Sequence, residues 1–352
     1  MHILADVFGG DKPQEIVYGV SRALGEDSTL KVTVTGDEGK IKELIASLKD
    51  KKAMNTALAA LNEGRLIICH APEVVTNDDS PTGALKEKKD SSMVRAMDLL
   101  NGSDEYAGML SSGNTGALLA GGFLKTGRIK GVLRPTLCGV MPTCIDGQGV
   151  AIADAGANVD CKPEFLTQFA HMASIYMNTA YGVAEPRVAL LSVGTEEKKG
   201  DELTSAAHAL LKADTSINFC GNMEARDALS GEFDVIVSDG FGGNVLLKAV
   251  EGTGKFVSTE LKAALKSSIL AKLGMLLLAR PLKRFKRKMD YHQYGGAPIL
   301  GLKKIICKAH GSCNSLAVLV VIRQIKKMYA GNLVAKIEEM VKREKENTTK
   351  SD

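Results

Sequence analysis

Tryptophan is absent from the sequence, proline occurs only 9 times, and aromatic residues make up 5% of the 352 residues. The core must therefore rely on Leu, Ile, Val, Ala and Met, within a total hydrophobic content of 45%. Long apolar runs are missing as well, since none reaches the ~20 residues that span a bilayer. The N-terminus lacks the basic and apolar segments of a signal peptide. We therefore expect a cytoplasmic protein with one large or two modest cores.

The 7 Cys residues form no Cys-x-x-Cys pair, and an odd number does not suit a disulfide framework. Reduced thiols in a cytosol are the simpler interpretation. The sequence has no His-Glu-x-x-His and no Cys/His set with zinc spacing, so we expect no metal site. The net charge of +4 is mild and does not by itself indicate nucleic-acid binding.

Three phosphate-, nucleotide- or acyl-binding motifs are missing or incomplete. Residues 122–127 have the glycine spacing of a P-loop, but Arg128 and Ile129 follow where Lys and Ser or Thr are needed, so the sequence does not support nucleoside triphosphate hydrolysis. No Gly-x-Gly-x-x-Gly follows the first apolar run, which weakens the case for a dinucleotide enzyme. No Gly-x-Ser-x-Gly elbow is present, so an acyl-serine intermediate is not indicated.

Short apolar runs alternate with segments of helical spacing, and this alternation predicts an α/β protein with a mostly parallel sheet covered by helices. We expect strands at His2–Val7, Leu30–Thr35, Leu66–Cys69, Tyr106–Leu110, Thr136–Met141, Val150–Ala153, Val188–Ser192, Ile217–Cys220 and Val235–Val237. We expect helices at Pro13–Leu24, Gly39–Leu48, Ser91–Leu100, Pro163–Asn178, Asp201–Lys212 and Asn244–Leu265.

Six of these strands end in loops that combine Gly with Asn, Asp, Ser or Thr. Ligands of open parallel sheets bind where the carboxyl ends of strands meet such loops. For any one loop a tight turn is a sufficient explanation, but the set together indicates a shared ligand site. The loops that carry our candidates are residues 6–11, 111–116 and 238–244.

The candidates fall into three groups. The first has a helix N-terminus, which attracts anions through its free N–H groups and dipole, although a plain N-cap is a strong alternative. It consists of Ser112, Gly113, Asn114, Thr115 and Gly116, together with Asp6 and Asp11. The second is Asp239, Gly242, Gly243 and Asn244, where glycines allow close approach and the amide can hydrogen-bond an oxygen.

The third group combines cations with a titratable ring, which suits phosphate binding and proton transfer near pH 7. Lys308 and His310 share one short loop, and Lys162 and Lys198 are further candidates. Ordinary solvated lysines are the alternative for the last two.

The segment from about 261 to 289 is basic and amphipathic. Its apolar side chains recur every three or four residues, and a cluster of cations with almost no acid follows. Such a helix binds a membrane surface, with Ile269, Leu273 and Leu277 entering the lipid and Arg280, Lys283 and Arg284 meeting anionic headgroups. Docking of an acidic carrier protein and packing against the core are the alternatives.

This segment interrupts an otherwise continuous pattern. We therefore expect one α/β domain over residues 1–338, with the 261–289 segment as a helical excursion. Residues 339–352 are polar, and we expect a tail that frays.

The loops, in their order along the chain, resemble those of the PlsX family of phosphate acyltransferases. The matching segments are residues 6–11, 111–118, 127–131, 156–164, 193–200, 221–227, 239–245, 294–298 and 308–312. Val7, Phe8 and Cys313 depart from the usual family residues, without removing a charged group.

The resemblance implies a three-layer αβα fold akin to isocitrate and isopropylmalate dehydrogenases and to phosphotransacetylase. It implies reversible transfer of a long-chain acyl group from acyl carrier protein to inorganic phosphate, without a metal or nucleotide cofactor. It further implies a homodimer whose acyl phosphate supplies a membrane glycerol-3-phosphate acyltransferase in phospholipid synthesis. Together with the basic amphipathic segment, this leads us to expect a cytoplasmic protein that associates peripherally with the inner face of the cell membrane. We take 1–338 as the catalytic domain.

In this interpretation Ser112, Gly113, Asn114 and Thr115 hold phosphate, and Lys308 is its counter-cation. Asn244 stabilises the oxyanion and His310 transfers a proton. Three alternatives stay open: a phosphotransacetylase that uses short acyl-CoA, a nicotinamide-dependent dehydrogenase on the related fold, and a non-enzymatic membrane scaffold.

Overall fold

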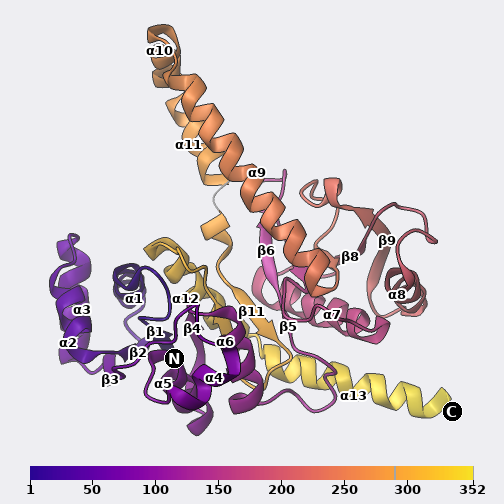
Figure 1. Cartoon of the computed structure of the whole chain (residues 1–352), viewed down its shortest axis with the longest axis horizontal. Helices are drawn as coiled ribbons and strands as arrows, with labels where there is room; N and C mark the ends of the chain where they lie inside the picture. The colour runs from indigo at the N-terminus through magenta and orange to yellow at the C-terminus, as the bar shows by residue number, and fades with distance from the viewer. Residues whose placement is uncertain (289–290, 352) are drawn as a thin grey trace.

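The computed structural model describes residues 1–288 and 291–351, and it contains two β-sheets (Figure 1). The larger sheet has the strand order β3-β2-β1-β4-β12-β11-β5. Its strands are β1 (His2–Asp6), β2 (Lys31–Gly36), β3 (Leu66–His70), β4 (Tyr106–Ser111), β5 (Thr136–Leu137), β11 (Ala297–Leu300) and β12 (Ile306–Lys308).

The smaller sheet has the order β6-β7-β10-β8-β9. Its strands are β6 (Gly139–Pro142), β7 (Gly149–Ala153), β8 (Arg187–Ser192), β9 (Asn218–Glu224) and β10 (Val235–Val237). Neighbouring strands in the two sheets are parallel except where β6 meets β7 and where β11 meets β12 and β5.

Helices lie between the strands and against the sheets. They are α1 (Pro13–Glu26), α2 (Glu38–Ala46), α3 (Lys51–Asn62), α4 (Pro81–Glu87), α5 (Ser92–Gly102), α6 (Thr115–Gly121), α7 (Pro163–Tyr176), α8 (Glu202–Ala213), α9 (Gly240–Lys266), α10 (Ile269–Leu277), α11 (Ala279–Lys288), α12 (Ser315–Ala330) and α13 (Leu333–Ser351). Short π and 3-10 turns are η1 (Gly122–Thr126), η2 (Met177–Tyr181), η3 (Ala225–Asp227) and η4 (Tyr291–Tyr294).

Strand β1 shows why helices cover both faces of the larger sheet. Ile3 and Ala5 belong to one apolar cluster and Leu4 to another, because successive side chains of a strand point to opposite faces. The first cluster includes the buried faces of α1 and α12, and the second includes those of α5 and α6. The predicted three-layer α/β fold with mostly parallel sheets is confirmed.

The predicted strand Thr136–Met141 is broken in the structure. It divides at Cys138 into β5, which pairs with β11 in the larger sheet, and β6, which pairs with β7 in the smaller sheet. The chain therefore crosses from one sheet to the other within this run. Strands β11 and β12 were not predicted, because they are only four and three residues long and carry no alternating pattern.

Helices α9, α10 and α11 form an arm that projects from the sheets (Figure 1). The buried residues of α9, namely Gly240, Gly243 and Leu246, all lie in its first two turns. At the other end of the arm, Lys288 of α11 lies 2.9 Å from the Asp146 carboxylate in the β6–β7 turn, and Arg284 also pairs with Asp146. Both ends of the arm are thus attached to the smaller sheet.

The segment 261–289, which we predicted as a helical excursion, lies in this arm, and it is not one helix. Ser268 interrupts it, since its hydroxyl accepts a hydrogen bond from the backbone N–H of Ala271 at 3.0 Å and so caps a new helix, α10. Residue 289 lies outside the described residues.

The polar tail expected from residue 339 begins within α13. Val341 is buried, and Gln168 of α7 donates a hydrogen bond to Glu344 at 2.9 Å. The first turns of this segment are therefore docked on α7 as a helix, where we expected fraying, because apolar residues at 337 and 341 lie one helical turn apart on its inner face.

Among the described residues, no helix combines the length and apolar character needed to cross a membrane.

Candidate active site

Three adjacent strands of the larger sheet end at one place. Strand β4 lies between β1 and β12, and Ser111 at its end is in register with Lys308 at the end of β12. On the other side, Ser111 donates a hydrogen bond from Oγ to Asp6 Oδ2 at 2.6 Å. Parallel pairing thus brings Asp6, Ser111 and Lys308 together from opposite ends of the chain.

The loops that follow these strands pack closely. The N–H of Gly9 donates to Asp6 Oδ1 at 3.0 Å. A Cβ added at Gly9 would lie 3.0 Å from the Cα of Gly113, and one added at Gly10 would lie 2.2 Å from Ser112 Oγ. Any side chain at either glycine would push the two loops apart, so the glycines fix their spacing.

Lys308 is a partly buried cation at the centre of this cluster. Its Nζ donates to the carbonyl oxygens of Ser112 at 3.2 Å and of Ala309 at 2.5 Å. Burial lowers the pKa of Lys308 to about 8, although the negative charges of Asp6 and Asp11 oppose that shift. An ammonium in such a site gains strongly from a bound anion, because the anion replaces part of the lost solvation.

His310 lies in the loop after β12, opposite the first loop of the chain. The N–H of Asp11 donates to the carbonyl of Gly311 at 3.3 Å, which joins the two loops. The N–H of Ser312 donates to His310 Nδ1 at 3.2 Å. A neutral His310 therefore carries its proton on Nε2.

Asn114 is the N-cap of α6. Its Oδ1 accepts from the N–H of Ala117 at 2.9 Å, and its Nδ2 donates to the carbonyl of Thr76 at 3.1 Å. The side chain is thus occupied by the helix cap and by the loop before α4. What remains for a ligand is the backbone at Asn114, Thr115 and Gly116, at a helix N-terminus.

The second predicted group forms the first turn of α9, which begins four residues before the predicted Asn244. Asp239 caps this helix, accepting from the N–H of Gly242 at 2.7 Å. A Cβ at Gly243 would lie 1.9 Å from the carbonyl oxygen of Asp154, so this glycine allows close packing with the loop after β7. Asn244 is exposed one turn into the helix.

Asp154, which the sequence analysis did not select, organises that loop. Its fully buried carboxylate accepts hydrogen bonds from the backbone N–H groups of four residues, at 2.6 to 3.2 Å, and from the Asn158 amide at 2.8 Å. The four backbone donors are Leu137, Gly156, Ala157 and Asn158. Burial raises the pKa of Asp154, and these hydrogen bonds oppose the shift.

The Asp154 loop in turn supports α9. The N–H of Gly240 donates to the carbonyl of Asn158 at 2.7 Å. Gly156 has a φ of +129°, which favours glycine, and its missing side chain would lie 3.4 Å from the Asn244 amide. An Asp directly after a fully apolar strand was the available sequence signal for this residue.

The two groups are electrostatically coupled. The positive charge of Lys248, one turn beyond Asn244 on α9, contributes to lowering the pKa of Lys308 on the larger sheet. Lys248 is therefore close enough to Lys308 for its charge to act on that residue. Lys248 is a second residue that the sequence analysis missed, because nothing in the spacing of α9 indicated which face would meet the other sheet.

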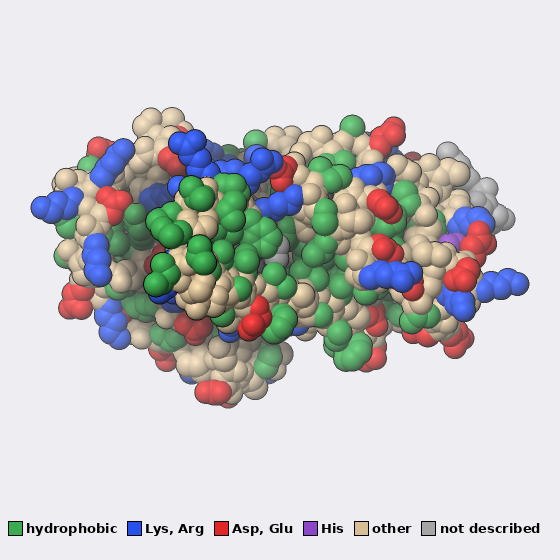
Figure 2. Space-filling model, turned by 90° about the horizontal axis from the view of Figure 1, so that it is seen from above, with side chains coloured by type: hydrophobic (Ala, Val, Ile, Leu, Met, Phe, Trp, Pro, Cys, Tyr) green, Lys and Arg blue, Asp and Glu red, His purple; other side chains and the backbone are tan. Residues whose placement is uncertain are grey.

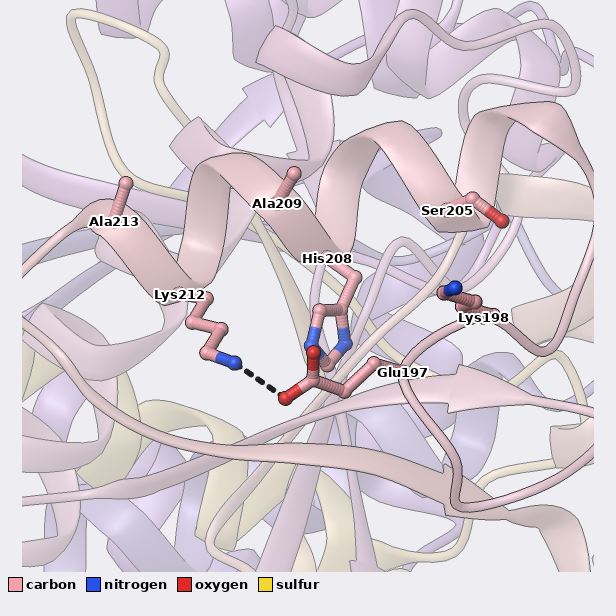
Figure 3. Close-up of a pocket in the computed structure, with 7 residues that line it drawn as sticks. All are labelled: Glu197, Lys198, Ser205, His208, Ala209, Lys212 and Ala213. Atoms are coloured by element: carbon pink, nitrogen blue, oxygen red, sulfur yellow. Dashed lines mark hydrogen bonds and ion pairs between the residues drawn. The ribbon is translucent and has the colours of Figure 1, made fainter.

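The two remaining predicted lysines differ in their surroundings. Lys162 is exposed directly before α7. Lys198 lines a cavity of about 500 Å³ beside α8, together with Glu197, His208 and Lys212 (Figure 3). In that cavity Lys212 pairs with Glu197, and none of its lining residues belongs to the Lys308 cluster. Within the described ranges, no group of three His, Cys, Asp or Glu side chains is arranged to hold a metal ion.

Comparison with known proteins assigns this sequence to one family. A sequence profile described as "Fatty acid synthesis protein" matches residues 1–336. The chain belongs to this family. The fatty acid synthesis family membership confirms the resemblance to PlsX on which the sequence interpretation rested.

Two similar relatives carry the name of an acyltransferase. A "Phosphate acyltransferase" of Geobacillus thermodenitrificans is 44% identical over 345 residues, covering 97% of this chain and 99% of that protein. A "Phosphate acyltransferase" of Bacillus subtilis is 42% identical over 347 residues, covering 98% and 99%. The predicted enzyme class, an acyltransferase, is confirmed.

Solved structures outside the family share the fold. A branched-chain phosphotransacylase from Enterococcus faecalis superposes with a TM-score of 0.57 at 14% identity, over 94% of this chain and 99% of that one. A phosphotransacetylase from Streptococcus pyogenes gives 0.55 at 15% identity, over 93% and 94%. The expected likeness to the phosphotransacetylase fold is confirmed.

Proposed function

We propose that this protein transfers a long-chain fatty acyl group from the thioester of acyl carrier protein to inorganic phosphate, giving an acyl phosphate. The observation that carries the proposal is Lys308, a partly buried cation beside the α6 N-terminus. A phosphate dianion needs both a counter-cation and N–H donors, and it would restore solvation to a lysine whose pKa burial has lowered to about 8.

Phosphate is held by the hydroxyl of Ser112 and by the backbone N–H groups of Asn114 and Thr115, against Lys308. Gly113 keeps the loop in place, since its own N–H donates to Ser111 Oγ at 3.1 Å. A phosphate oxygen attacks the thioester carbonyl carbon, and the C–S bond breaks as the tetrahedral intermediate collapses. Because a thiolate is a good leaving group, no acyl-enzyme is needed. The Asn244 amide, reaching from α9, donates to the carbonyl oxygen as negative charge develops on it.

His310 protonates the departing thiolate. As the imidazolium, the ring gives its Nε2 proton to sulfur, since Nδ1 faces the N–H of Ser312. The proton that the attacking hydrogen phosphate loses restores the charge of the ring. The step balances without a metal or redox partner: one C–O bond forms, one C–S bond breaks, and one proton passes from hydrogen phosphate to sulfur.

The test is release of free carrier-protein thiol from palmitoyl-carrier protein, with palmitoyl-CoA as a parallel donor. We expect rapid release that requires both phosphate and the carrier-linked donor. The shared fold makes a phosphotransacylase acting on acyl-CoA the second candidate. Preference for the CoA donor would favour that candidate, and no release from either donor would contradict both.

We also propose that the protein binds peripherally to the inner face of the cell membrane through α10, at the tip of the arm farthest from the sheets. Large apolar side chains are exposed there, with Ile269 79%, Leu273 55% and Leu277 87% exposed. Viewed from above, hydrophobic side chains gather over the end of the arm and cations lie along one edge (Figure 2). Arg280 and Lys283 supply basic charge on α11, whereas the third predicted cation, Arg284, is paired with Asp146 of the β6–β7 turn.

Replacing Leu273 and Leu277 with Glu should abolish sedimentation with vesicles that contain phosphatidylglycerol. Each substitution places a charge where an apolar side chain would enter the acyl region. Thiol release from a soluble acyl-carrier donor should persist, since neither residue is near Lys308. Unchanged vesicle binding by this double variant would contradict membrane attachment through α10.

A homodimer is part of the same proposal, as is delivery of acyl phosphate to a membrane glycerol-3-phosphate acyltransferase. The dimer is supported by an exposed row of small and apolar residues on α9. The row repeats every three or four residues and consists of Val245, Ala249, Gly252 and Phe256. A second copy of α9 would cover this row.

A further inference from the structure

Helix α9 carries a row of lysines that begins beside Asn244. Lys248, Lys255 and Lys262 recur every seven residues, and Lys266 follows one turn later. With 3.6 residues per turn, the four lysines and Asn244 lie within an arc of about 40° on the helix surface. All five side chains are exposed.

Acidic residues do not cancel this row. Glu251 accepts from Lys248 at 2.7 Å and partly neutralises it. Glu260, the other acid of α9, lies on the opposite side of the helix. Lys255, Lys262 and Lys266 thus present three positive charges along one line. This line runs next to the exposed row of small and apolar residues on α9 and shares no residue with it.

The lysine row begins beside the residues that we propose to act in acyl transfer. Its first member, Lys248, acts on the pKa of Lys308, and Asn244 lies one turn before it. Lys255 is 11 residues beyond Asn244, which corresponds to roughly 16 Å along a helix. A donor docked on the row would therefore sit a short distance from the reacting atoms, which suits a substrate carried on a flexible arm.

We propose that the lysine row of α9 is the docking surface for an acidic helix of the acyl carrier protein. This proposal rests on the proposed function, because it requires a carrier-linked thioester. Charge complementarity selects the occupant: a basic line on a straight helix matches acidic side chains on a second helix. Anionic lipid is the competing occupant, but lipid at this position would not bring a thioester to Asn244.

The test compares two double variants of the full-length protein with the same change in charge. Lys255→Glu with Lys262→Glu reverses the row. Lys283→Glu with Lys286→Glu reverses α11, which is exposed on the same arm. Affinity for fluorescently labelled holo-carrier protein is measured by anisotropy at two salt concentrations, and vesicle binding by sedimentation. Far-UV circular dichroism checks folding, which surface substitutions should preserve.

We expect the row variant to weaken carrier binding at least tenfold, with the parent's salt dependence reduced and vesicle binding unchanged. The α11 variant should show the reverse pattern. Parent-like carrier affinity in the row variant would overturn the proposal, as would loss of vesicle binding alone. Since binding is read without turnover, an enzyme that binds the carrier through the row but releases no thiol would contradict the proposed reaction and leave the docking surface supported.

Discussion

Replacing Lys308 with Met should lower kcat/KM for phosphate by about 10²–10³-fold, because the site loses the cation that faces the dianion. The fold should not suffer equally. Burial holds the pKa of this lysine at about 8, below the ~10.4 of an unfolded chain, so the charged amine opposes folding at neutral pH. We therefore expect the variant to melt at the parent's temperature or above it. A large fall in melting temperature together with parent-like kinetics would contradict this role.

The pH dependence provides a second measurement on the same residue. With a pKa of about 8, Lys308 loses its charge as pH rises through 8, and kcat/KM for phosphate should fall about tenfold per unit above that value. Lys308→Arg is the matched comparison, because a guanidinium stays charged across this range. Whatever activity it retains should show no fall near pH 8. A fall at the same pH in both enzymes would assign the titration to another group.

Replacing Asp154 with Asn should cost about 2–4 kcal/mol of unfolding free energy, since an amide cannot accept from all the N–H groups that surround the carboxylate. It should also lower kcat more than tenfold. The loop that Asp154 organises supports the first turn of α9, so its distortion displaces Asn244 from the reacting carbonyl. Denaturant unfolding and steady-state kinetics measure the two effects separately.

Asp234→Asn is the matched control for that experiment. Asp234 is also buried in the smaller sheet, but it lies before β10, at the opposite end from Asn244, and binds Arg187 at 2.8 Å. We expect a comparable loss of stability with kcat within about twofold of the parent. In an Asn244→Ala background, Asp154→Asn should have little further effect on kcat. Additive effects in that double variant would show that Asp154 acts independently of Asn244.

The sequence predicted the strands that are long and apolar, because burial on both faces leaves a continuous hydrophobic run such as that of β1. It failed where pairing depends on distant partners. The run from Thr136 to Met141 looks continuous, yet its two halves hydrogen-bond to different sheets. Strands β11 and β12 are short, and they are recognised as strands only through their partners. Strand β11 pairs with β5, and β12 pairs with β4.

The same distinction applies to the site. Loops that follow predicted strands led us to predict Asp6 and Ser112 as site residues, since parallel strands end at a common edge. Lys308 was predicted from the cation and imidazole of its loop, without knowledge of the strand before it. Asp154 and Lys248 were missed because their importance depends on which side of the smaller sheet meets the larger one. Lys198, predicted as a further cation of the site, lies instead in a cavity with His208. The sequence was enough to find the loops. Which of them lie together depends on how the two sheets are placed relative to each other.

Strand β12, which carries Lys308, comes late in the chain but pairs with the early strand β4. The proposed activity therefore requires that the chain be made past β12. This strand is inserted beside β4, although the smaller sheet and the arm lie between them in the sequence. During synthesis the N-terminal strands emerge first, and β4 remains an unpaired edge until the segment around Ile306 is available. Unpaired edges recruit strands from other chains. A chain that stops before β12 therefore lacks Lys308 and exposes an aggregation-prone edge at once, whereas the finished chain gains its cation and closes that edge in the same step.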